Sequence, residues 1–396
     1  MSFLVFCSFE VGGIPFRMAD ILNRHKVETY YIYLGKNTAD HNSTQFHYGK
    51  LSWNWDLSKL FQDDLNNPGR IIQLLLQVQE KYSISDCLAI GIDAYLLKEA
   101  GIPYKYWTYG SDLDQYCFIR ASLSNPVLSK RLLIHPLRVY QERQRGRKSI
   151  RRSDSVMIAP YQFKALMKVS LNKEMYFLPH PLNILEFSEL EKKRKENRES
   201  ICKEVGADEY FFSSTRHVWA GSSRKMNDRK GNDVVLHAFA KYLRLSKGRR
   251  SKLVLVKKGH DVEHSRKLAR SLGIERSVEW LEEMKREALD KYYQGASICF
   301  GQFGASVINF SVLEPLANAS VCVSFFKETN SSLPYYKTIP PVFNSREPQK
   351  IAEFMIRTLS NEEIYNGLSY NSWLWVKENC SEEKFVESFL GLFQEA

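Results

Sequence analysis

The stretch at 302–324, QFGASVINFSVLEPLANASVCVS, constrains the fold of this chain more than any other segment. An apolar run at 297–300 comes before it and predicts a buried strand, and a second apolar run at 321–326 predicts another. A loop and an apolar helix that carries one acid, Glu314, lie between the two runs. Because two parallel strands need a long crossover, usually a helix, the stretch predicts one βαβ unit.

Glu314 is the first candidate functional residue. It falls in the first turns of the expected helix, on the side that holds the preceding loop. A carboxylate in that position accepts hydrogen bonds from a ribose diol, and the N–H groups of the loop can face an anion. A plain βαβ unit with a solvated glutamate explains the same pattern, so both interpretations stay open on this stretch alone.

The chain of 396 residues is long enough for two domains of ordinary size. Its seven cysteines are scattered, odd in number and without a CxxC pair, which indicates a reducing compartment and argues against a zinc site. No apolar run approaches the length of about 20 residues that a membrane span needs. Glu10 follows the N-terminal apolar run and no basic segment precedes it, so we expect no signal peptide and a cytoplasmic protein.

The formal net charge of +11 favours acidic partners: nucleic acid, an anionic membrane surface or phosphorylated substrates. The segment at 128–152 concentrates this charge, because nine lysines and arginines alternate there with apolar residues. A basic amphipathic helix of this kind can lie on anionic lipid, at the inner face of the membrane. Binding to an anionic acceptor, binding to nucleic acid, and a solvated helix face are the alternatives.

The first half alternates strands and helices. Residues 2–8 predict a buried strand, Gly12 and Gly13 a turn, and residues 16–23 a helix. Paired glycines between a strand and a helix allow close backbone approach to a ligand such as a diphosphate, although a tight turn without a ligand fits equally. Further strands are expected at 27–34, 87–92, 104–108, 155–159 and 175–178, and helices at 57–65, 69–82, 94–100 and 161–169.

Polar residues follow the expected strand at 104–108. The sequence Tyr109-Gly110-Ser111-Asp112 can cap the next helix through Ser111 or Asp112. It also places Tyr109 and Asp112 at the carboxyl ends of the strands, where open α/β sheets bind their ligands. The local sequence fits a cap and a site alike.

A Pro-containing segment near residue 182 separates the halves, and the alternation then restarts. The strand at 210–215 ends at Arg216, and Lys230-Gly231 precedes a helix at 234–245. The Lys230 ammonium and the N–H groups at the start of the helix, opposite Arg216, could hold a diphosphate. The alternative is an exposed loop that binds no ligand. Further strands are expected at 252–256 and 278–281, and helices at 264–272, 288–294, 348–359, 361–378 and 382–393. The charged run at 189–199 and the segment at 327–347 receive no element.

Several signatures are absent from the sequence. It contains no GxxxxGK[ST], no HExxH and no GxSxG, and no GxGxxG follows the first strand. No histidine forms a metal-ligand spacing with neighbouring cysteines or acids. The pattern argues against P-loop nucleotidases, zinc enzymes and α/β-hydrolases, and it weakens a dinucleotide interpretation.

With both halves considered, the sequence resembles a GT-B glycosyltransferase of the retaining family 4 type. Arg216 and Lys230-Gly231 look like the strand-end arginine and the Lys-Gly of that family, with a longer loop between them. The segment 313–317, LEPLA, resembles the LEA-type helix of the family, and 178–183 resembles its linker. The turn at 109–112 is similar to its HGxD turn, and Gly12-Gly13 to its first glycine loop.

The resemblance implies an α/β fold with two Rossmann-like, doubly wound domains that face a cleft, and C-terminal helices that close the chain. An acceptor-side domain would span 1–182 and a nucleotide-sugar-binding domain 183–375. The last segment, 376–396, would hold a helix that packs back on the N-terminal domain.

The resemblance also implies residue roles. Arg216 and Lys230 would neutralise the diphosphate as it leaves, and Glu314 would bind the ribose hydroxyls. Asp112 and Tyr109 would serve catalysis together with that cationic pair. The remaining expected donor-binding residues are Gly12, Gly13, Ser306, Val307, Ile308 and Asn309, which would offer N–H groups to phosphate and sugar.

The sequence departs from the family pattern at three places. The paired acids of the family lie eight residues apart, and Ser306 stands where the first acid is expected. Val307, Ile308 and Asn309 replace the glycines usual in that loop, and Tyr109 replaces the histidine of the HGxD turn. The QFG-to-LE spacing resembles a divergent branch that also lacks the first acid.

The expected function is therefore transfer of a sugar from a UDP- or GDP-sugar to a polysaccharide, lipid-linked or other glycan acceptor, with retention and without a metal or cofactor. One alternative is a GT-B-like protein that binds nucleotide but has lost transfer. Another is a basic binder of membranes or nucleic acid led by residues 128–152. Since no nucleic-acid-binding motif is present, no nucleic acid partner is expected.

Overall fold

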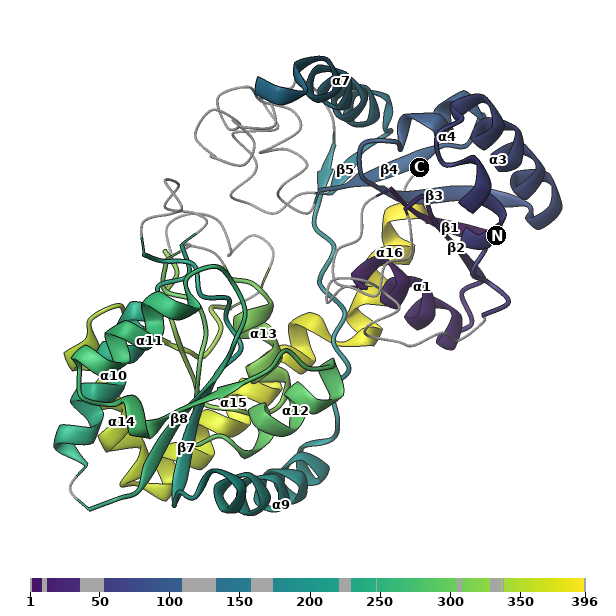
Figure 1. The fold of residues 1–396 in the computed structure, drawn as a ribbon. Coiled ribbons are helices and arrows are strands. Elements are labelled where there is room, and N and C mark those ends of the chain that lie inside the picture. The colour runs from purple at the N-terminus through teal and green to yellow at the C-terminus, as the bar shows by residue number, and fades with distance from the viewer. Residues whose placement is uncertain are drawn as a thin grey trace. The chain divides into compact units, whose positions relative to one another are not determined.

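The computed structural model describes residues 2–8, 13–35, 53–108, 133–157, 174–220, 229–246, 248–304, 308–327, 336 and 338–394. The chain divides into two units: unit 1 comprises Met1–Pro181 and Glu382–Ala396, and unit 2 comprises Leu182–Ser381. In each unit, helices cover both faces of one parallel sheet (Figure 1). The predicted α/β class with two doubly wound halves is confirmed.

The sheet of unit 1 has six parallel strands in the order β2-β1-β3-β4-β5-β6. Its first strand is buried along its whole length, as expected for a parallel sheet that is covered on both faces. The strands are β1 (Ser2–Cys7), β2 (Thr29–Tyr33), β3 (Ile84–Ile90), β4 (Tyr104–Trp107), β5 (Val156–Met157) and β6 (Met175–Tyr176).

Successive side chains of β1 point to opposite helical layers. Leu4 and Phe6 lie in a core cluster with residues of α3 and α4. Phe3, on the other face, packs against Phe389 and Phe393 of α16, with ring centroids 5.2 and 5.1 Å away. The helical elements of unit 1 are α1 (Ile14–Arg24), η1 (Ser58–Asp64), α3 (Pro68–Tyr82), α4 (Tyr95–Glu99), α7 (Pro136–Arg152) and α16 (Glu382–Gln394).

The sheet of unit 2 also has six parallel strands, in the order β12-β11-β10-β7-β8-β9. Successive side chains of β7 belong to two hydrophobic clusters: Phe211 lies in one cluster, and Tyr210 and Phe212 lie in the other. The strands are β7 (Glu209–Ser213), β8 (Ser251–Val256), β9 (Val278–Leu281), β10 (Ile298–Phe300), β11 (Cys322–Ser324) and β12 (Phe343–Asn344).

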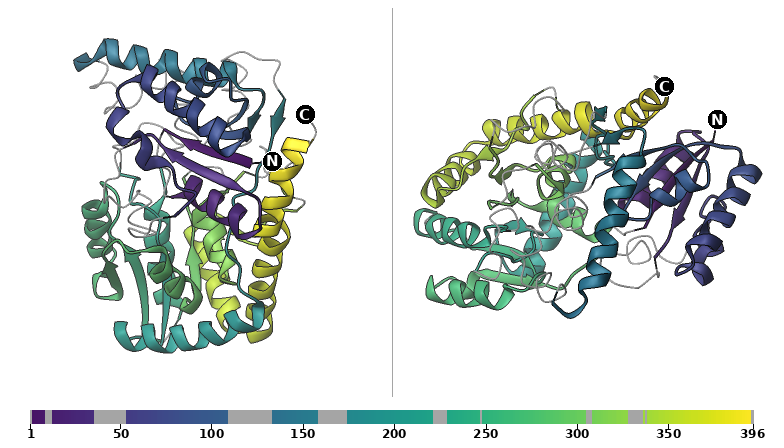
Figure 2. Two further views of the ribbon diagram at one scale, coloured as in Figure 1. Left: turned by 90° about the vertical axis from the view of Figure 1, so that its right-hand side faces the viewer. Right: turned by 90° about the horizontal axis from the view of Figure 1, so that it is seen from above.

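Two helical layers cover this sheet (Figure 1, Figure 2). Residues of α10 and α14 share the core cluster of Phe211, whereas residues of α9 and α12 pack around Tyr210 and Phe212. The helical elements of unit 2 are α9 (Phe187–Val205), α10 (Asn232–Leu245), α11 (Val262–Ser271), η4 (Glu275–Ser277), α12 (Arg286–Gly295), α13 (Phe310–Ala317), α14 (Pro348–Leu359) and α15 (Glu362–Cys380).

The end of unit 2 coincides with the end of a long helix. Helix α15 continues unbroken to Cys380, so residues 376–380 belong to unit 2 and not to the final segment in which the sequence analysis placed them. Helix α16 follows directly and packs within unit 1. There Arg24 of α1 donates hydrogen bonds of 2.6 and 3.0 Å to the Glu382 carboxylate.

Three elements of unit 2 received no prediction: α9, β12 and the short helical turn η4. Helix α9 contains the charged run at 189–199 and buries only three of its residues, Leu190, Arg194 and Ile201, so its apolar pattern is sparse. Strand β12 is two residues long and lies in the segment at 327–347. The helix expected at 161–169 lies outside the described residues. No helix in the described part of the chain has both the length and the hydrophobicity of a membrane span.

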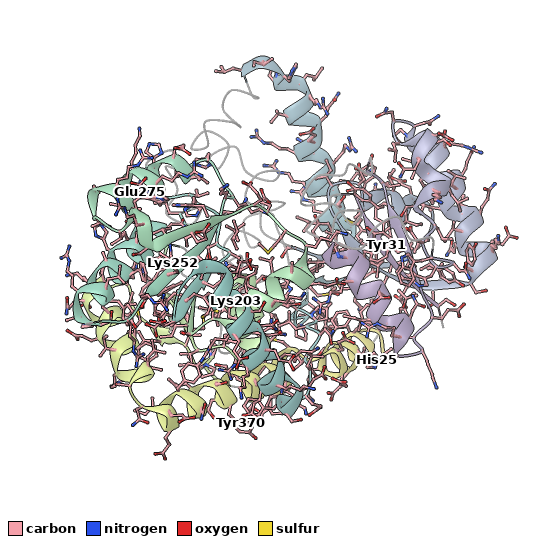
Figure 3. All side chains as sticks on the ribbon, turned by 60° about the horizontal axis from the view of Figure 1, so that its bottom comes forward. His25, Tyr31, Lys203, Lys252, Glu275 and Tyr370 are labelled. Atoms are coloured by element: carbon pink, nitrogen blue, oxygen red, sulfur yellow. The ribbon has the colours of Figure 1, made fainter. Side chains whose placement is uncertain are left out.

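In both sheets the chain reverses its direction of growth beside the first strand. In unit 1, β2 lies on one side of β1 and β3 on the other, and in unit 2, β8 and β10 flank β7 in the same way. Open α/β sheets bind ligands at the carboxyl ends of their strands next to this switch point. Lys252 and Glu275 mark the amino ends of β8 and β9 (Figure 3), so the loops at the carboxyl ends of the strands lie at the opposite edge.

The packing of α16 is testable by mutation. Phe389 is fully buried, and its ring lies 5.2 Å from Phe3 and 4.9 Å from Phe393. We expect Phe389→Ala to reduce the stability of unit 1 by about 3–5 kcal/mol, because the cavity it leaves cannot fully collapse. Urea denaturation followed by circular dichroism measures the change. The control Leu76→Ala, on an exposed position of α3, should shift the transition little; equal transitions in the two variants would contradict the packing.

Candidate functional site

Arg216 lies three residues past the end of β7, at the switch point of unit 2. Its side chain is exposed, whereas the flanking residues Thr215 and His217 are buried. Asn232, the buried first residue of α10, bridges the two sides of this turn. Its Nδ2 donates to the Thr215 carbonyl at 3.1 Å, and its Oδ1 accepts from the Val218 N–H at 3.4 Å. The backbone around Arg216 is therefore fixed while its guanidinium faces outward.

Lys230 is held to the loop that follows β10. Its Nζ donates to Oε1 of Gln302 at 3.0 Å. Gln302 is fully buried, and its carbonyl accepts from the Ser324 hydroxyl at 2.7 Å and from the Phe325 N–H at 3.0 Å. The ammonium of Lys230 is thus positioned by a residue that is itself anchored to β11.

Two glycines make this approach of loops feasible. Gly231 has φ +71°, and a Cβ there would lie 2.8 Å from Cβ of Phe303. A Cβ on Gly304 would lie 2.0 Å from the carbonyl oxygen of Arg229. The Phe303 N–H donates to the Lys230 carbonyl at 2.8 Å. The start of α10, which has no side-chain cap, therefore lies directly against the QFG loop.

Glu314 lies on α13, and its side chain is only 14% exposed. Its Oε1 accepts from Nη1 of Arg286 at 2.6 Å, and its Oε2 accepts from the Tyr293 hydroxyl at 3.1 Å. The Tyr293 hydroxyl in turn lies 2.5 Å from the hydroxyl of Ser214, the first residue after β7. Glu314 is therefore connected to the turn of Arg216, and it is not a solvated surface acid.

The loop before α13 is only partly described. Asn309 caps the helix, because its Oδ1 accepts from the Ser311 N–H at 3.0 Å and from the Ser311 hydroxyl at 2.7 Å. Ile308 precedes it and is half-buried. Ser306 and Val307 lie outside the described residues.

In unit 1 only one of the expected site residues is described. Gly13 caps α1 with φ 72° and ψ 9°, a left-handed conformation that favours glycine, and its carbonyl accepts from the Arg17 N–H at 2.9 Å. It lies on the loop after β1, at the switch point of that sheet. Gly12, Tyr109 and Asp112 lie outside the described residues.

A buried polar cluster supports the turn of Arg216 from the side of β8. The Asp261 carboxylate accepts from the N–H groups of Trp219 and Ala220 at 2.7 and 3.0 Å. Burial alone would raise the pKa of Asp261, but these N–H donors hold it below its usual value. His217 Nδ1 lies 2.8 Å from the Ser265 hydroxyl, and burial lowers the pKa of this histidine to about 4.

The structure thus gathers Arg216, Lys230 and Glu314 at the carboxyl ends of the adjacent strands β7 and β10. Sequence reasoning did not identify the four residues that hold them in place: Asn232, Gln302, Arg286 and Tyr293. Asn232 directly follows Lys230-Gly231, and its type alone could have suggested a turn-bridging amide. Arg286 and Tyr293 lie 28 and 21 residues before Glu314, and no local spacing signals their contact with it.

Comparison with known proteins agrees with this placement. Residues 219–373, most of unit 2, match the family model Glycosyl transferases group 1. Among curated proteins none matches the sequence of this chain.

Several solved structures share the fold over the whole chain. HepE from Anabaena in complex with UDP-glucose has a TM-score of 0.65 at 12% identity, and the match covers 100% of both chains. Sucrose-phosphate synthase from Thermosynechococcus elongatus has a TM-score of 0.60 at 13% identity and a UDP-forming α,α-trehalose-phosphate synthase from Burkholderia xenovorans 0.58 at 14%; each match covers 100% of this chain and 99% of the other. Part of unit 2 is therefore similar to glycosyl transferases group 1, and the chain has the GT-B fold of these structures, as the sequence resemblance predicted.

The protonation of His217 is testable by titration. Its folded pKa of about 4 lies below the ordinary value of 6.5, so the unfolded chain binds more protons between these two values. The contribution of His217 to stability is therefore complete above pH 6.5 and is lost as the pH falls toward 4. We expect the imidazole to remain neutral at pH 5.5 in NMR spectra of histidine-labelled protein, with His217→Asn identifying the signal. A charged His217 ring at pH 5.5 would show that the ring is not buried as described.

Proposed function

We propose that the protein transfers a sugar from a UDP- or GDP-sugar to a glycan or lipid-linked acceptor. The observation that carries this proposal is the convergence of Arg216, Lys230 and Glu314 at the switch point of unit 2, part of which is similar to glycosyl transferases group 1. UDP or UDP-glucose is named in the complexes of HepE, and the trehalose-phosphate synthase is named as UDP-forming. These names support a nucleoside diphosphate as the leaving group here.

The cationic residues suit a departing diphosphate. Arg216 is exposed, and Lys230 is fixed next to the start of α10, where the helix dipole and the N–H groups of the first turn favour an anion. Preorganised charges that face the leaving group stabilise the transition state as its negative charge develops. On this basis we propose that Arg216 and Lys230 supply the charge that a metal ion supplies in other transferases, and that activity persists in the presence of EDTA.

The remaining expected residues complete the proposal. Glu314 would receive the ribose hydroxyls, and the N–H groups at Gly12, Gly13 and the loop 306–309 would contact phosphate and sugar. Asp112 and Tyr109 of unit 1 would serve the reacting sugar and the acceptor. Transfer would proceed with retention through an oxocarbenium-like state.

Release of nucleoside diphosphate tests the proposed activity. In the presence of a panel of UDP- and GDP-sugars and glycan acceptors, we expect release by the wild-type protein. Arg216→Ala and Lys230→Ala should each lower kcat about 10²–10³-fold, the size expected for removal of one stabilising charge. Lys252→Ala, at the amino ends of the strands, is the control and should retain activity. Neither binding nor release with any donor, or full activity of both site variants, would overturn the proposal.

A binding protein without transfer is the second candidate, because Ser306 stands in the place of the first acid of the family pattern. The same assay separates the two functions. Tight binding of UDP or GDP without release from any sugar donor would favour this candidate.

We further propose that α7 brings unit 1 to an anionic membrane surface. Four apolar side chains are exposed at its start: Leu133 and Ile134 just before the helix, and Leu137 and Tyr140 in its first turns, with Leu133 83% and Leu137 68% exposed. The helix carries seven lysines and arginines and only one acid. Some of this charge is already paired, since Arg145 contacts Asp93, and Lys148 and Arg152 contact Glu99. Exposed leucines at the end of a net basic helix fit the boundary between headgroups and acyl chains.

Vesicle flotation tests the membrane proposal. We expect the protein to float with vesicles that contain phosphatidylserine or phosphatidylglycerol, but not with phosphatidylcholine alone. Leu133→Gln combined with Leu137→Gln should reduce the bound fraction at least about fivefold, because each leucine loses the transfer free energy of its apolar surface. The exposed Leu76→Gln on α3 is the matched control. Equal binding of the double variant and the control would contradict this role of α7.

A further inference from the structure

The carboxylate of Glu314 is held on both oxygens by residues of one helix. Arg286 and Tyr293 lie seven residues apart on α12, and each donates to a different oxygen, at 2.6 and 3.1 Å. The two contacts fix the carboxylate plane as well as its position. A single contact would leave the group free to rotate about its last torsion, which is broad for glutamate.

Arg286 and Tyr293 do not occupy every acceptor position of the Glu314 carboxylate. An ionised carboxylate has about four acceptor sites, two on each oxygen. Arg286 and Tyr293 each use one of these. One acceptor position therefore remains on each oxygen, which matches two neighbouring hydroxyls such as the 2′ and 3′ hydroxyls of a ribose.

In the hydrogen bond between Tyr293 and Glu314, the tyrosine is the donor. Tyr293 is buried, and burial together with the charge of Glu314 raises the pKa of its hydroxyl well above the ordinary value, so the proton stays on the phenol. The phenol has one proton and gives it to Glu314, so Ser214 must donate to Tyr293. This chain of donors begins two residues before Arg216 and ends at Glu314. It links the turn that carries the proposed phosphate contact to the proposed ribose contact.

The arginine contact places charge beside the acid without burying it. The side chain of Arg286 is 26% exposed, and its guanidinium lies 5.8 Å from the centre of the Phe310 ring, at the start of α13. Arg286 therefore touches both the acid and the first residue of the helix that carries it. This double contact is more than a surface ion pair needs and suits a positioning role.

We propose that Arg286 and Tyr293 are positioning residues that orient the Glu314 carboxylate so that it discriminates a ribose from a deoxyribose in the bound nucleotide. The proposal rests on the proposed function. Neither residue contacts the nucleotide itself; each acts through Glu314. Loss of either leaves the acid present but free to turn, so the cost falls on the contacts to the ribose hydroxyls.

The experiment compares nucleotides that differ only at the sugar. The dissociation constants of UDP and 2′-deoxy-UDP, and of GDP and 2′-deoxy-GDP, are measured by calorimetry for the wild type, Arg286→Gln, Arg286→Lys and Tyr293→Phe. The wild type should bind the preferred ribonucleotide at least about tenfold more tightly than its deoxy analogue, because one hydrogen bond to a charged group contributes about 1.5 kcal/mol or more. In Arg286→Gln and Tyr293→Phe this ratio should fall below about threefold, while the affinity for the deoxy analogue changes little. Arg286→Lys should restore part of the ratio.

A matched control separates positioning from general stability. Arg270→Gln breaks an ion pair of 2.7 Å with Glu275 elsewhere in unit 2 and should keep the wild-type ratio. If the ratio is unchanged in Arg286→Gln and Tyr293→Phe, or if both nucleotides lose affinity equally, Arg286 and Tyr293 have no positioning role and the inference is overturned. If the wild type binds neither UDP nor GDP, the proposed function fails and this inference fails with it.

Discussion

The contact between the start of α10 and the loop after β10 is the constraint on which the site depends. Phe303 donates its N–H to the carbonyl of Lys230, and Gly231 and Gly304 allow the two backbones to meet without side chains between them. These segments follow β7 and β10, which are neighbours in the sheet but lie far apart in the sequence. Because of this contact, the ammonium of Lys230 has a fixed position at the switch point of the sheet.

The same edge of the sheet carries one acid, Glu314, and two cations, Arg216 and Lys230. The acid keeps its own orientation there. Glu314 is bound by Arg286 and Tyr293, and Lys230 is bound by Gln302. Direct pairing of Lys230 with Glu314 would cancel the charge that a diphosphate needs. Neutral and cationic partners from other elements hold each group in its own place, so the site can keep positive charge for phosphate and an acid for hydroxyls.

Much of the fold follows from local sequence, because parallel strands covered on both faces are nearly continuous apolar runs. The runs around Phe211, Val254 and Cys299 therefore predicted strands. Helix α9 was not predicted, because its buried residues, Leu190, Arg194 and Ile201, include an arginine and lie too far apart to form an apolar stripe. Strand β12 was not predicted, because two residues are too few to show the alternation of a strand.

The candidate site was partly predictable for the same reason. Arg216, Lys230 and Glu314 follow strands or begin helices, and such positions are visible in the alternation of elements. Their partners were not predictable, since Arg286, Tyr293 and Gln302 reach them across 21 to 72 residues of sequence. Pairing of that kind depends on the order of strands in the sheet, which local patterns do not encode.

A crystal structure of the protein with bound UDP or GDP would show which groups hold the nucleotide. We expect the diphosphate to lie against the start of α10, within hydrogen-bonding distance of Arg216 and Lys230, and the ribose hydroxyls to bond to the two oxygens of Glu314. A nucleotide bound elsewhere, or one whose ribose is turned away from Glu314, would contradict this expectation.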